Sequence, residues 1–588
     1  MPRPAYTDGS PSLCDRWGRR SDLVFYAVLA ILAVLMLVRA AYGTEWYGDE
    51  SYALGTPMRY VAGDHPIVDS WESHFSSGIL LTPFVWVLEK TKPDGTGIVL
   101  MFRYLFVAMQ AIYAFALWRL IRPHAPSWAA IVTSCAAFLY VPYFYLIPYY
   151  NSIMLPAMML SALALLRAFT GDEGRSGRWL VASGVLAGVG IIAYPTMLLA
   201  LPFFCTGIVL EARRRSDSGD GLVRRTLVAF LGSMFAALGV FAVVTIAASG
   251  MRHLPEALPY FLHPVDRDIS LSGLVSRLER TWTVLIAPAA AVLVFAVGAL
   301  IARKRRAPLA GVIVATIVAT IAVAFVVYRV KAPSISFLDM PQATALGIGM
   351  VVPLMMLCRR DARTDTLFRL LCIPAFGLGV GTLVASHEGF ETAAMPAVIA
   401  MIATLLVLAG PRGGERDARW IGPAVALPVV GAALVAAFFL FIGAQYTAGD
   451  AAVRQLGTTI TTGPYAGLHT TADNAALYMS YMKQLQPLEA STGRIAFLEE
   501  FPQGYLFTGR LPGTYSVWTT FATGDRLQRY LNINGNYPDD IVATRFTGPN
   551  GGVAAKPFAP PFGLTAFAKK YKERYRTQDF VVYGRVTK

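Results

Sequence analysis

Charged side chains are scarce in this sequence. Asp, Glu, Lys and Arg together make up 15% of its 588 residues, whereas about 25% is usual in soluble domains. Hydrophobic residues make up 55%, and the mean hydropathy is +0.50. This balance excludes a disordered chain, a collagen-like chain and a typical cytosolic enzyme. It predicts a membrane protein with many spans.

Cysteine is scarce as well. One of the five cysteines precedes the first apolar stretch, and the others lie inside or at the ends of later stretches. This distribution excludes a disulfide framework and a zinc knuckle. The five are Cys14, Cys135, Cys205, Cys358 and Cys372. The sequence also lacks a Walker-type loop, and its glycine-rich run at 377–382 lies inside an apolar stretch, which argues against a nucleotide site.

Apolar stretches of about 20 residues, the length that crosses a bilayer, recur from Leu23 to Gly443. From them we predict an α-helical polytopic membrane protein with about thirteen transmembrane helices. The spans are expected at 23–42, 98–118, 127–147, 152–168, 179–194, 195–210, 226–249, 282–302, 308–329, 341–358, 366–385, 391–409 and 420–443.

Segment 78–88 decides the orientation of the chain. It is apolar but only about half as long as a crossing requires. If it lies in the membrane interface, the basic clusters of the loops fall on one side, which the positive-inside rule makes cytoplasmic. The N-terminus (1–22) is then cytoplasmic, and the outer face carries a first loop at 43–97 and a second at about 250–281.

Residues 444–588 are predicted to form an extracytoplasmic α/β domain that follows the transmembrane domain (23–443). Strand-like runs at 494–498, 515–519, 540–544 and 580–586 alternate with helix-like runs at 472–485, 525–531 and 565–575. Such alternation is typical of a small α/β layer with a parallel sheet.

Two adjacent carboxylates, Asp49 and Glu50, follow the first span and precede a helix-like stretch from Ser51 to Val61. Asp49 fits two roles that are compatible with each other. It can cap the helix by accepting backbone N–H groups, or it can act as a general base at the membrane surface, where a lipid-linked donor and a water-soluble acceptor can meet.

This layout resembles the GT-C superfamily, integral-membrane glycosyltransferases that use polyprenyl-phosphate-linked sugars. Lipid A aminoarabinose transferases and protein O-mannosyltransferases are most similar in layout. Beside Asp49-Glu50, the short matches are Gly63-Asp64, Ser77-Gly78 through Pro83, Arg103, Tyr194-Pro195-Thr196 and His387 through Pro396. The Lys-Pro-Pro stretch of aminoarabinose transferases and the Trp-Trp-Asp motif of oligosaccharyltransferases are missing. Aminoarabinose donors and en bloc transfer to Asn are therefore not predicted.

The resemblance implies inverting sugar transfer to an envelope glycan, lipid or protein, in a cell membrane that is most typically bacterial. Asp49 and Glu50 are the predicted catalytic residues, with Asp49 as the base that takes the acceptor's proton. Fixed positive charge is most effective where the leaving phosphate develops its own charge. We expect Arg59, Arg267 and Lys331 to bind the donor phosphate.

Most of the histidines fall on the predicted outer face. No two have a fixed ligand spacing, so the sequence indicates no definite cofactor and leaves a divalent metal open. The candidate metal or substrate residues are His65, His74, His263, His387 and Glu388. The aromatic run at 140–150 is predicted to lie in the interfacial belt, with sugar stacking as the alternative.

Two other functions are weighed against the transferase. A transporter or lipid flippase would place ionisable groups at the centres of its spans, and the predicted spans are nearly free of them. A polysaccharide polymerase or ligase would carry its chemistry in a large late outer loop, whereas the outer loops after 329 are short. No nucleic-acid partner is expected, because the basic residues lie in short runs between the spans.

Overall fold

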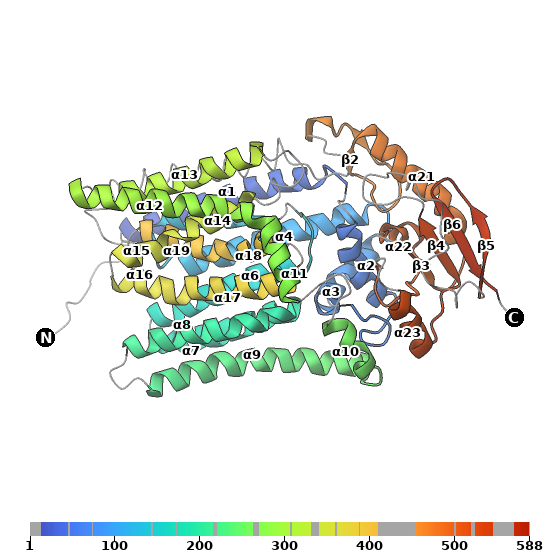
Figure 1. Cartoon of the computed structure of the whole chain (residues 1–588), viewed down its shortest axis with the longest axis horizontal. Helices are drawn as coiled ribbons and strands as arrows, with labels where there is room; N and C mark the ends of the chain where they lie inside the picture. The colour runs from blue at the N-terminus through green and yellow to red at the C-terminus, as the bar shows by residue number, and fades with distance from the viewer. Residues whose placement is uncertain are drawn as a thin grey trace.

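The computed structural model describes most of the chain. The described residues are 13–44, 48–72, 74–142, 145–171, 173–215, 220–262, 270–305, 309–330, 340–358, 361–386, 389–409, 453–498, 501–518, 524–544 and 570–586. Long helices lie side by side in a bundle, and a domain containing a β-sheet lies at one end of it (Figure 1). Helices α2 (Asp49–Val61) and α3 (Phe75–Thr91) lie between the two parts.

The bundle follows the apolar pattern of the sequence. In lipid, a helix satisfies its own backbone hydrogen bonds, so a long apolar run forms one. Within the described residues, nine helices are long and apolar enough to cross a membrane. The helices of the bundle and its loops are α1 (Leu13–Ala40), α4 (Ile98–Ile121), α5 (Ser127–Leu139), α6 (Tyr150–Thr170), α7 (Glu173–Ala193), η2 (Pro195–Ala200), α8 (Leu201–Arg215), α9 (Asp220–Ser249), α10 (Leu254–Leu262), α11 (Leu271–Thr281), η3 (Trp282–Leu285), α12 (Ile286–Arg305), α13 (Leu309–Val330), α14 (Met340–Gly349), α15 (Val351–Cys358), α16 (Ala362–Leu367), η4 (Phe368–Cys372), α17 (Ile373–Ala385), α18 (Phe390–Ala394) and α19 (Ala397–Ala409).

The predicted spans from 23–42 to 391–409 coincide with helices over most of their described residues, and the predicted turn at Tyr194-Pro195 separates α7 from η2. The span at 127–147 is wrong at its end, because α5 stops at Leu139 and the described residues 140–141 and 145–147 are not helical. The short segment 78–88 lies within α3, whose 17 residues are fewer than the about 20 of a typical crossing. The predicted span at 420–443 lies outside the described residues.

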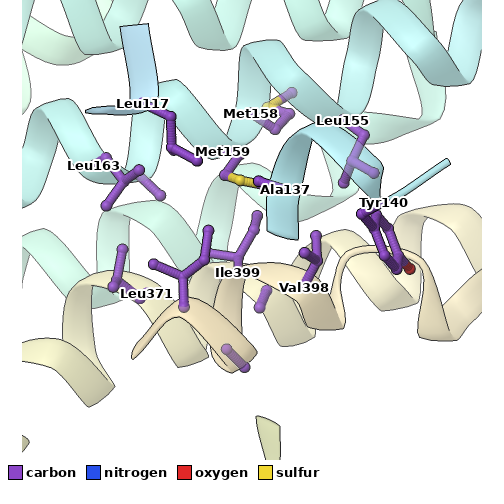
Figure 2. Packing of buried hydrophobic residues seen from close by; sticks show 14 of the residues in the cluster. Leu117, Ala137, Tyr140, Leu155, Met158, Met159, Leu163, Leu371, Val398 and Ile399 are labelled. Carbon is purple, nitrogen blue, oxygen red and sulfur yellow. The ribbon is translucent and has the colours of Figure 1, made fainter. Parts of the chain in front are cut away.

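The interior of the bundle is packed with aliphatic, methionine and aromatic side chains. Figure 2 shows how α4, α5, α6, η4 and α19 contribute to one layer of it. Its labelled members are Leu117, Ala137, Tyr140, Leu155, Met158, Met159, Leu163, Leu371, Val398 and Ile399.

The C-terminal domain has a mixed four-stranded sheet in the order β3-β4-β6-β5. Only β3 and β4 are parallel, and β6 runs antiparallel to both of its neighbours. Its elements are η6 (Val453–Gln455), β1 (Thr458–Thr459), β2 (His469–Thr470), α21 (Ala472–Glu489), β3 (Ile495–Phe497), α22 (Gln503–Thr508), α23 (Gly524–Asn534), β4 (Asp540–Thr544), β5 (Tyr571–Arg576) and β6 (Phe580–Arg585).

The predicted α/β class is confirmed, but the wholly parallel sheet is wrong. The predicted helix at 565–575 is strand β5 over its described part, and 515–518 is irregular rather than a strand. Charged side chains made β5 resemble an exposed helix, yet they also suit the edge of a sheet, where charge discourages pairing with other chains.

The C-terminal domain packs on the ends of the first helices of the bundle. The amide of Gly97 donates to the carbonyl of Gly463 at 3.0 Å, and the amide of Gly43 donates to that of His469 at 2.8 Å. The ring of Tyr465 is fully buried in a cluster shared by α2, α3, α4 and this domain. The first loop is therefore covered by the C-terminal domain.

Candidate functional site

The acidic pair lies at the start of α2. Gly48 precedes the helix in a left-handed conformation, with φ of 79°, and is its N-cap residue. Asp49 is thus the first residue of the helix, so the alternative in which it is the N-cap is not what the structure shows. A Cβ at Gly48 would lie 2.8 Å from Cγ of Pro502. The C-terminal domain therefore contacts the chain directly beside Asp49.

Glu50 is held by a buried ion pair. Nε of Arg103 lies 2.6 Å from Oε1 of Glu50, and Nη2 lies 2.7 Å from Oε2. Nη1 of Arg103 donates to the carbonyls of Ala40 and Gly43. Both side chains are completely buried. This two-point pair joins α2 and α4 to the end of α1, so Glu50 positions the loop. A catalytic role for Glu50 stays a prediction.

Asp49 faces a different environment from its neighbour, because it is only partly buried. Its carboxylate lies close enough to Tyr149 to act on that phenol electrostatically. Burial raises the pKa of Tyr149 well above its ordinary value, the neighbouring amide of Asn151 lowers it in part, and the negative charge of Asp49 raises it further. Tyr149 is therefore a neutral phenol beside Asp49, the partly exposed member of the acidic pair.

His74 lies in a cluster of aromatic rings next to Tyr149. Its ring stacks on that of Tyr150 with a centroid separation of 3.8 Å and an angle of 8°. Tyr194 lies 5.6 Å from His74 and 5.1 Å from Tyr150, and the rings of Tyr149 and Tyr150 are 5.1 Å apart. The structure thus brings the predicted residue His74 together with tyrosines from the start of α6 and the end of α7.

Arg59 lies in a buried network of partners. Its Nε lies 2.8 Å from Oδ2 of Asp64, and its Nη2 donates to the carbonyls of Asp69 and Thr514. The guanidinium is buried between the first loop and the C-terminal domain. These partners enclose the guanidinium, although its Nη1 is buried without a hydrogen bond to a described residue. Phosphate binding by Arg59 therefore stays a prediction.

The first loop is attached to the C-terminal domain by further charges. Nη2 of Arg494 lies 2.6 Å from Oδ1 of Asp64, and Nδ2 of Asn536 donates to Oδ1 of Asp69 at 2.9 Å. Asp64 therefore pairs with one arginine from each side of the junction. His65 lies on this same loop and is exposed, away from the enclosed part of the junction.

Glu72 is a buried carboxylate for which the sequence predicted no definite role. It accepts hydrogen bonds from Oγ1 of Thr56 at 2.7 Å and from Oγ of Ser516 at 2.8 Å. Burial raises the pKa of Glu72, opposed by these hydrogen bonds and by the charge of Arg59. No local motif announces this site, because Ser516 lies 444 residues away in the chain.

A metal site is not evident in the part of the chain that the structure describes. No three His, Cys, Asp or Glu side chains gather there in a way that would hold an ion. His74 lies among tyrosines, and His65 is exposed on another part of the loop. The described donor set does not fit a metal, and we derive no step through one. The remaining candidates, His263, His387 and Glu388, lie outside the described residues, as do Arg267 and Lys331.

Comparisons with known proteins give similarity in structure only. No protein-family model and no curated protein sequence matches the chain. The archaeal oligosaccharyltransferase AglB from Archaeoglobus fulgidus, in complex with an inhibitory peptide and a dolichol-phosphate, is 12% identical with a TM-score of 0.44, over 88% of this chain and 69% of that chain. The same organism's oligosaccharyltransferase in complex with Zn and sulfate is 12% identical, over 88% and 68%, with a TM-score of 0.45. ArnT from Cupriavidus metallidurans in the apo state is 13% identical, over 96% and 98%, with a TM-score of 0.42.

AglB and ArnT are GT-C superfamily membrane glycosyltransferases, the superfamily that the layout of the sequence resembles. The similarity extends over most of the chain, and its low identity and TM-scores limit it to a likeness of fold. We base no assignment of donor, acceptor or residue role on it.

Proposed function

We propose that this chain transfers a sugar from a polyprenyl-phosphate-linked donor to an envelope glycan, lipid or protein. Asp49 is the general base, and the anomeric configuration is inverted. The protein acts as a multi-pass membrane protein with its N-terminus in the cytoplasm and its C-terminal domain on the outer face.

The observation that carries this proposal is that two adjacent carboxylates lie in different environments. Glu50 is completely buried in its pair with Arg103, whereas Asp49 is partly exposed next to Tyr149. A carboxylate acts as a base only if a substrate can reach it. The buried pair holds the start of α2, and Asp49 is the first residue of that helix. The backbone position of Asp49 is therefore fixed, while the residue is partly exposed.

The reaction requires one proton transfer and one displacement. A carboxylate oxygen of Asp49 takes the proton from an acceptor hydroxyl. At the same time, the oxygen of that hydroxyl attacks the anomeric carbon of the donor sugar. A new carbon–oxygen bond forms, the bond from the anomeric carbon to the phosphate oxygen breaks, and polyprenyl phosphate leaves with the bonding electrons. Arg267 and Lys331 are our proposed partners for the charge of the leaving phosphate. An arginine can bind two phosphate oxygens at once, and a lysine acts as a point charge.

The test is release of lipid by purified protein in nanodiscs. Undecaprenyl phosphate carrying a radiolabelled sugar is supplied with a crude envelope acceptor, and free undecaprenyl phosphate is measured. We expect Asp49→Asn to lower the rate by at least about 100-fold, because a positioned proton acceptor supplies about 10²–10⁴-fold. Asp473→Asn is the matched control, since Asp473 is an exposed acid in the first turn of α21.

Equal release by wild type and Asp49→Asn would reject Asp49 as the base. If wild type binds the donor and releases no lipid with any acceptor fraction, transfer itself is rejected. Movement of labelled lipid between leaflets without release would then indicate a flippase.

A further inference from the structure

Two arginines and a histidine meet at the end of the bundle opposite to the C-terminal domain, where α16 lies (Figure 1). Arg167 is in the last turn of α6, and Arg363 belongs to α16. His124 lies in the loop between α4 and α5. Both arginines are close enough to His124 to act on its ring electrostatically. The positive-inside rule predicts that this end is the cytoplasmic one.

The positive charge of this cluster is only partly neutralised in the part of the chain that the structure describes. The guanidinium of Arg167 has no hydrogen bond or ion pair with a described residue. Nη2 of Arg363 donates to the carbonyl of His124 at 2.9 Å and to a carbonyl of α19 at 2.7 Å. The carboxylate that acts on Arg363 is that of Asp361, which also accepts hydrogen bonds from the first amides of α16. Two guanidinium groups thus leave a net positive charge at this place.

The ring of His124 responds to that charge. Its Nδ1 lies 3.3 Å from Oγ1 of Thr170, whose own hydrogen is donated to the carbonyl of Leu166. We therefore assign a hydrogen to Nδ1, which leaves Nε2 of the neutral ring as an acceptor. Nε2 is buried and has no hydrogen bond to a described residue. Burial and the charges of Arg167 and Arg363 lower the pKa of His124 to about 4, so the ring is neutral at pH 7.

Both arginines lie at the ends of candidate membrane spans. Arg167 is in the last turn of the span Tyr150–Thr170, and Arg363 is the second residue of the span that starts at Ala362. Arginines at span ends extend to the level of the lipid headgroups. An apolar surface adjoins them, because Leu357 at the end of α15 is 83% exposed and α15 contacts α16. A lipid whose chains cover this surface has its headgroup at the level of the arginines.

We propose that Arg167 and Arg363 bind the phosphate of an anionic phospholipid whose acyl chains lie against α15 and α16. A guanidinium can bind two phosphate oxygens at once, and basic sites between the cytoplasmic ends of membrane helices suit anionic headgroups. This site is separate from the proposed base. Tyr149, which lies beside Asp49, precedes the first residue of α6, and about 27 Å of helix separates it from Arg167.

The test is native mass spectrometry of the full chain, titrated with phosphatidylglycerol and, separately, with phosphatidylcholine of the same acyl chains. We expect the first phosphatidylglycerol to bind at least about tenfold more tightly than the first phosphatidylcholine. Arg167→Gln should weaken the first phosphatidylglycerol about tenfold, through lost charge-assisted hydrogen bonds. It should leave phosphatidylcholine unchanged. Since Arg167 has no partner among the described residues, its loss should not lower the melting temperature.

Arg119→Gln is the matched control. Arg119 is an exposed arginine in the last turn of α4, so this variant removes the same charge from the end of a neighbouring helix. Arg119 is not among the groups that act on His124. Its substitution should change the affinity for phosphatidylglycerol less than about twofold, because a single exposed charge contributes little.

The pH dependence of binding gives a second readout. The charged groups that act on His124 are Arg167 of α6 and Arg363 of α16, and neither titrates near neutral pH. A phosphate between them offsets their charge, so binding should raise the pKa of His124 and take up a proton. The affinity for phosphatidylglycerol, followed by the rise in melting temperature, should therefore increase several-fold as the pH falls from about 7.5 to 5.5. His124→Asn lacks the titrating ring and should lose this trend while it still binds the lipid.

Three results would overturn the inference. Equal weakening by Arg167→Gln and Arg119→Gln would mean that the lipid responds only to the general positive charge of this end. Equal first affinities for the two lipids in the unsubstituted chain would reject an anionic headgroup. Displacement of phosphatidylglycerol by a low concentration of inorganic phosphate would identify a soluble phosphate as the ligand. The proposed function does not enter this test, and Asp49→Asn should bind phosphatidylglycerol as the unsubstituted chain does.

Discussion

Arg103 and Glu50, 53 residues apart in the chain, form a buried two-point ion pair with separations of 2.6 and 2.7 Å. The same guanidinium donates to two carbonyls at the end of α1. A buried pair of this kind contributes little net stability compared with apolar residues, but breaking it leaves an uncompensated charge. Here the pair fixes positions, because the guanidinium of Arg103 joins α1, α2 and α4 directly beside Asp49.

The first prediction is that the two adjacent acids respond differently to amide substitution. Glu50→Gln should lower the free energy of unfolding by about 3–5 kcal/mol, because Arg103 keeps its buried charge without a counter-ion. Asp49→Asn should leave stability within about 0.5 kcal/mol, because Asp49 is partly exposed, while abolishing turnover. Thermal unfolding and lipid release, measured on the same preparations, give both quantities.

A double variant tests the assignment for Glu50. Glu50→Gln combined with Arg103→Met removes both charges, and it should recover part of the stability that Glu50→Gln loses. If Glu50→Gln were as stable as wild type and inactive, Glu50 would belong to the chemistry, contrary to our assignment.

The sequence predicted the helices better than the site. A long apolar run predicts a span because in lipid a helix satisfies its own backbone hydrogen bonds. The turn between two such runs was also predictable, and α7 and η2 meet at Tyr194-Pro195. Site contacts are different, since they join distant segments. Asp49-Glu50 was recognisable as a motif in the sequence. That Glu50 is buried in an ion pair while Asp49 is partly exposed depends on Arg103, which lies 53 residues further along the chain. Arg59 has the charge that a phosphate site needs, but the sequence could not predict that Asp64 and the C-terminal domain would enclose it.

The second prediction concerns the attachment of the first loop. Asp64→Asn should cost about 3 kcal/mol or more, because Arg59 loses its counter-ion in a fully buried setting. Residues 62–72 should exchange amide hydrogens faster, while α6 and α7 keep their protection. Glu573→Gln is the control, since it breaks an exposed pair with Arg576, and exposed pairs contribute little to stability. Similar effects of the two substitutions would contradict the buried network.

The third prediction is a pH dependence of stability that comes from Glu72. Burial raises the pKa of this carboxyl group in the folded chain, so the folded state binds more protons than the unfolded state between the ordinary and the raised pKa. The free energy of unfolding from this group therefore falls as pH rises through that window. Glu72→Gln lacks this titration and should gain in melting temperature, relative to wild type, as the pH rises from about 4 to 8.

Melting curves of wild type and Glu72→Gln across this pH range measure the difference. Glu573→Gln, an exposed acid on β5, should show a much smaller trend. A difference that shrinks with rising pH would mean that the Thr56 and Ser516 hydrogen bonds stabilise the carboxylate more than burial destabilises it.

The last prediction concerns Gly48, where two separate costs meet. Its φ of 79° is unfavourable for any residue with a Cβ, by about 1–2 kcal/mol. A Cβ would also lie 2.8 Å from Cγ of Pro502, so Gly48→Ala must move either the C-terminal domain or the first turn of α2. Gly509→Ala has only the unfavourable backbone conformation, because the φ of Gly509 is 63° and nothing lies within 4 Å of the added carbon.

We therefore expect Gly48→Ala to destabilise the protein more than Gly509→Ala, and only Gly48→Ala to lower the rate of lipid release by tenfold or more, because displacement of α2 misplaces Asp49. Adding Pro502→Ala to Gly48→Ala removes the steric cost but keeps the backbone cost, so it should restore most of the activity and only part of the stability. Restoration of neither would show that Pro502 does not determine the position of Asp49.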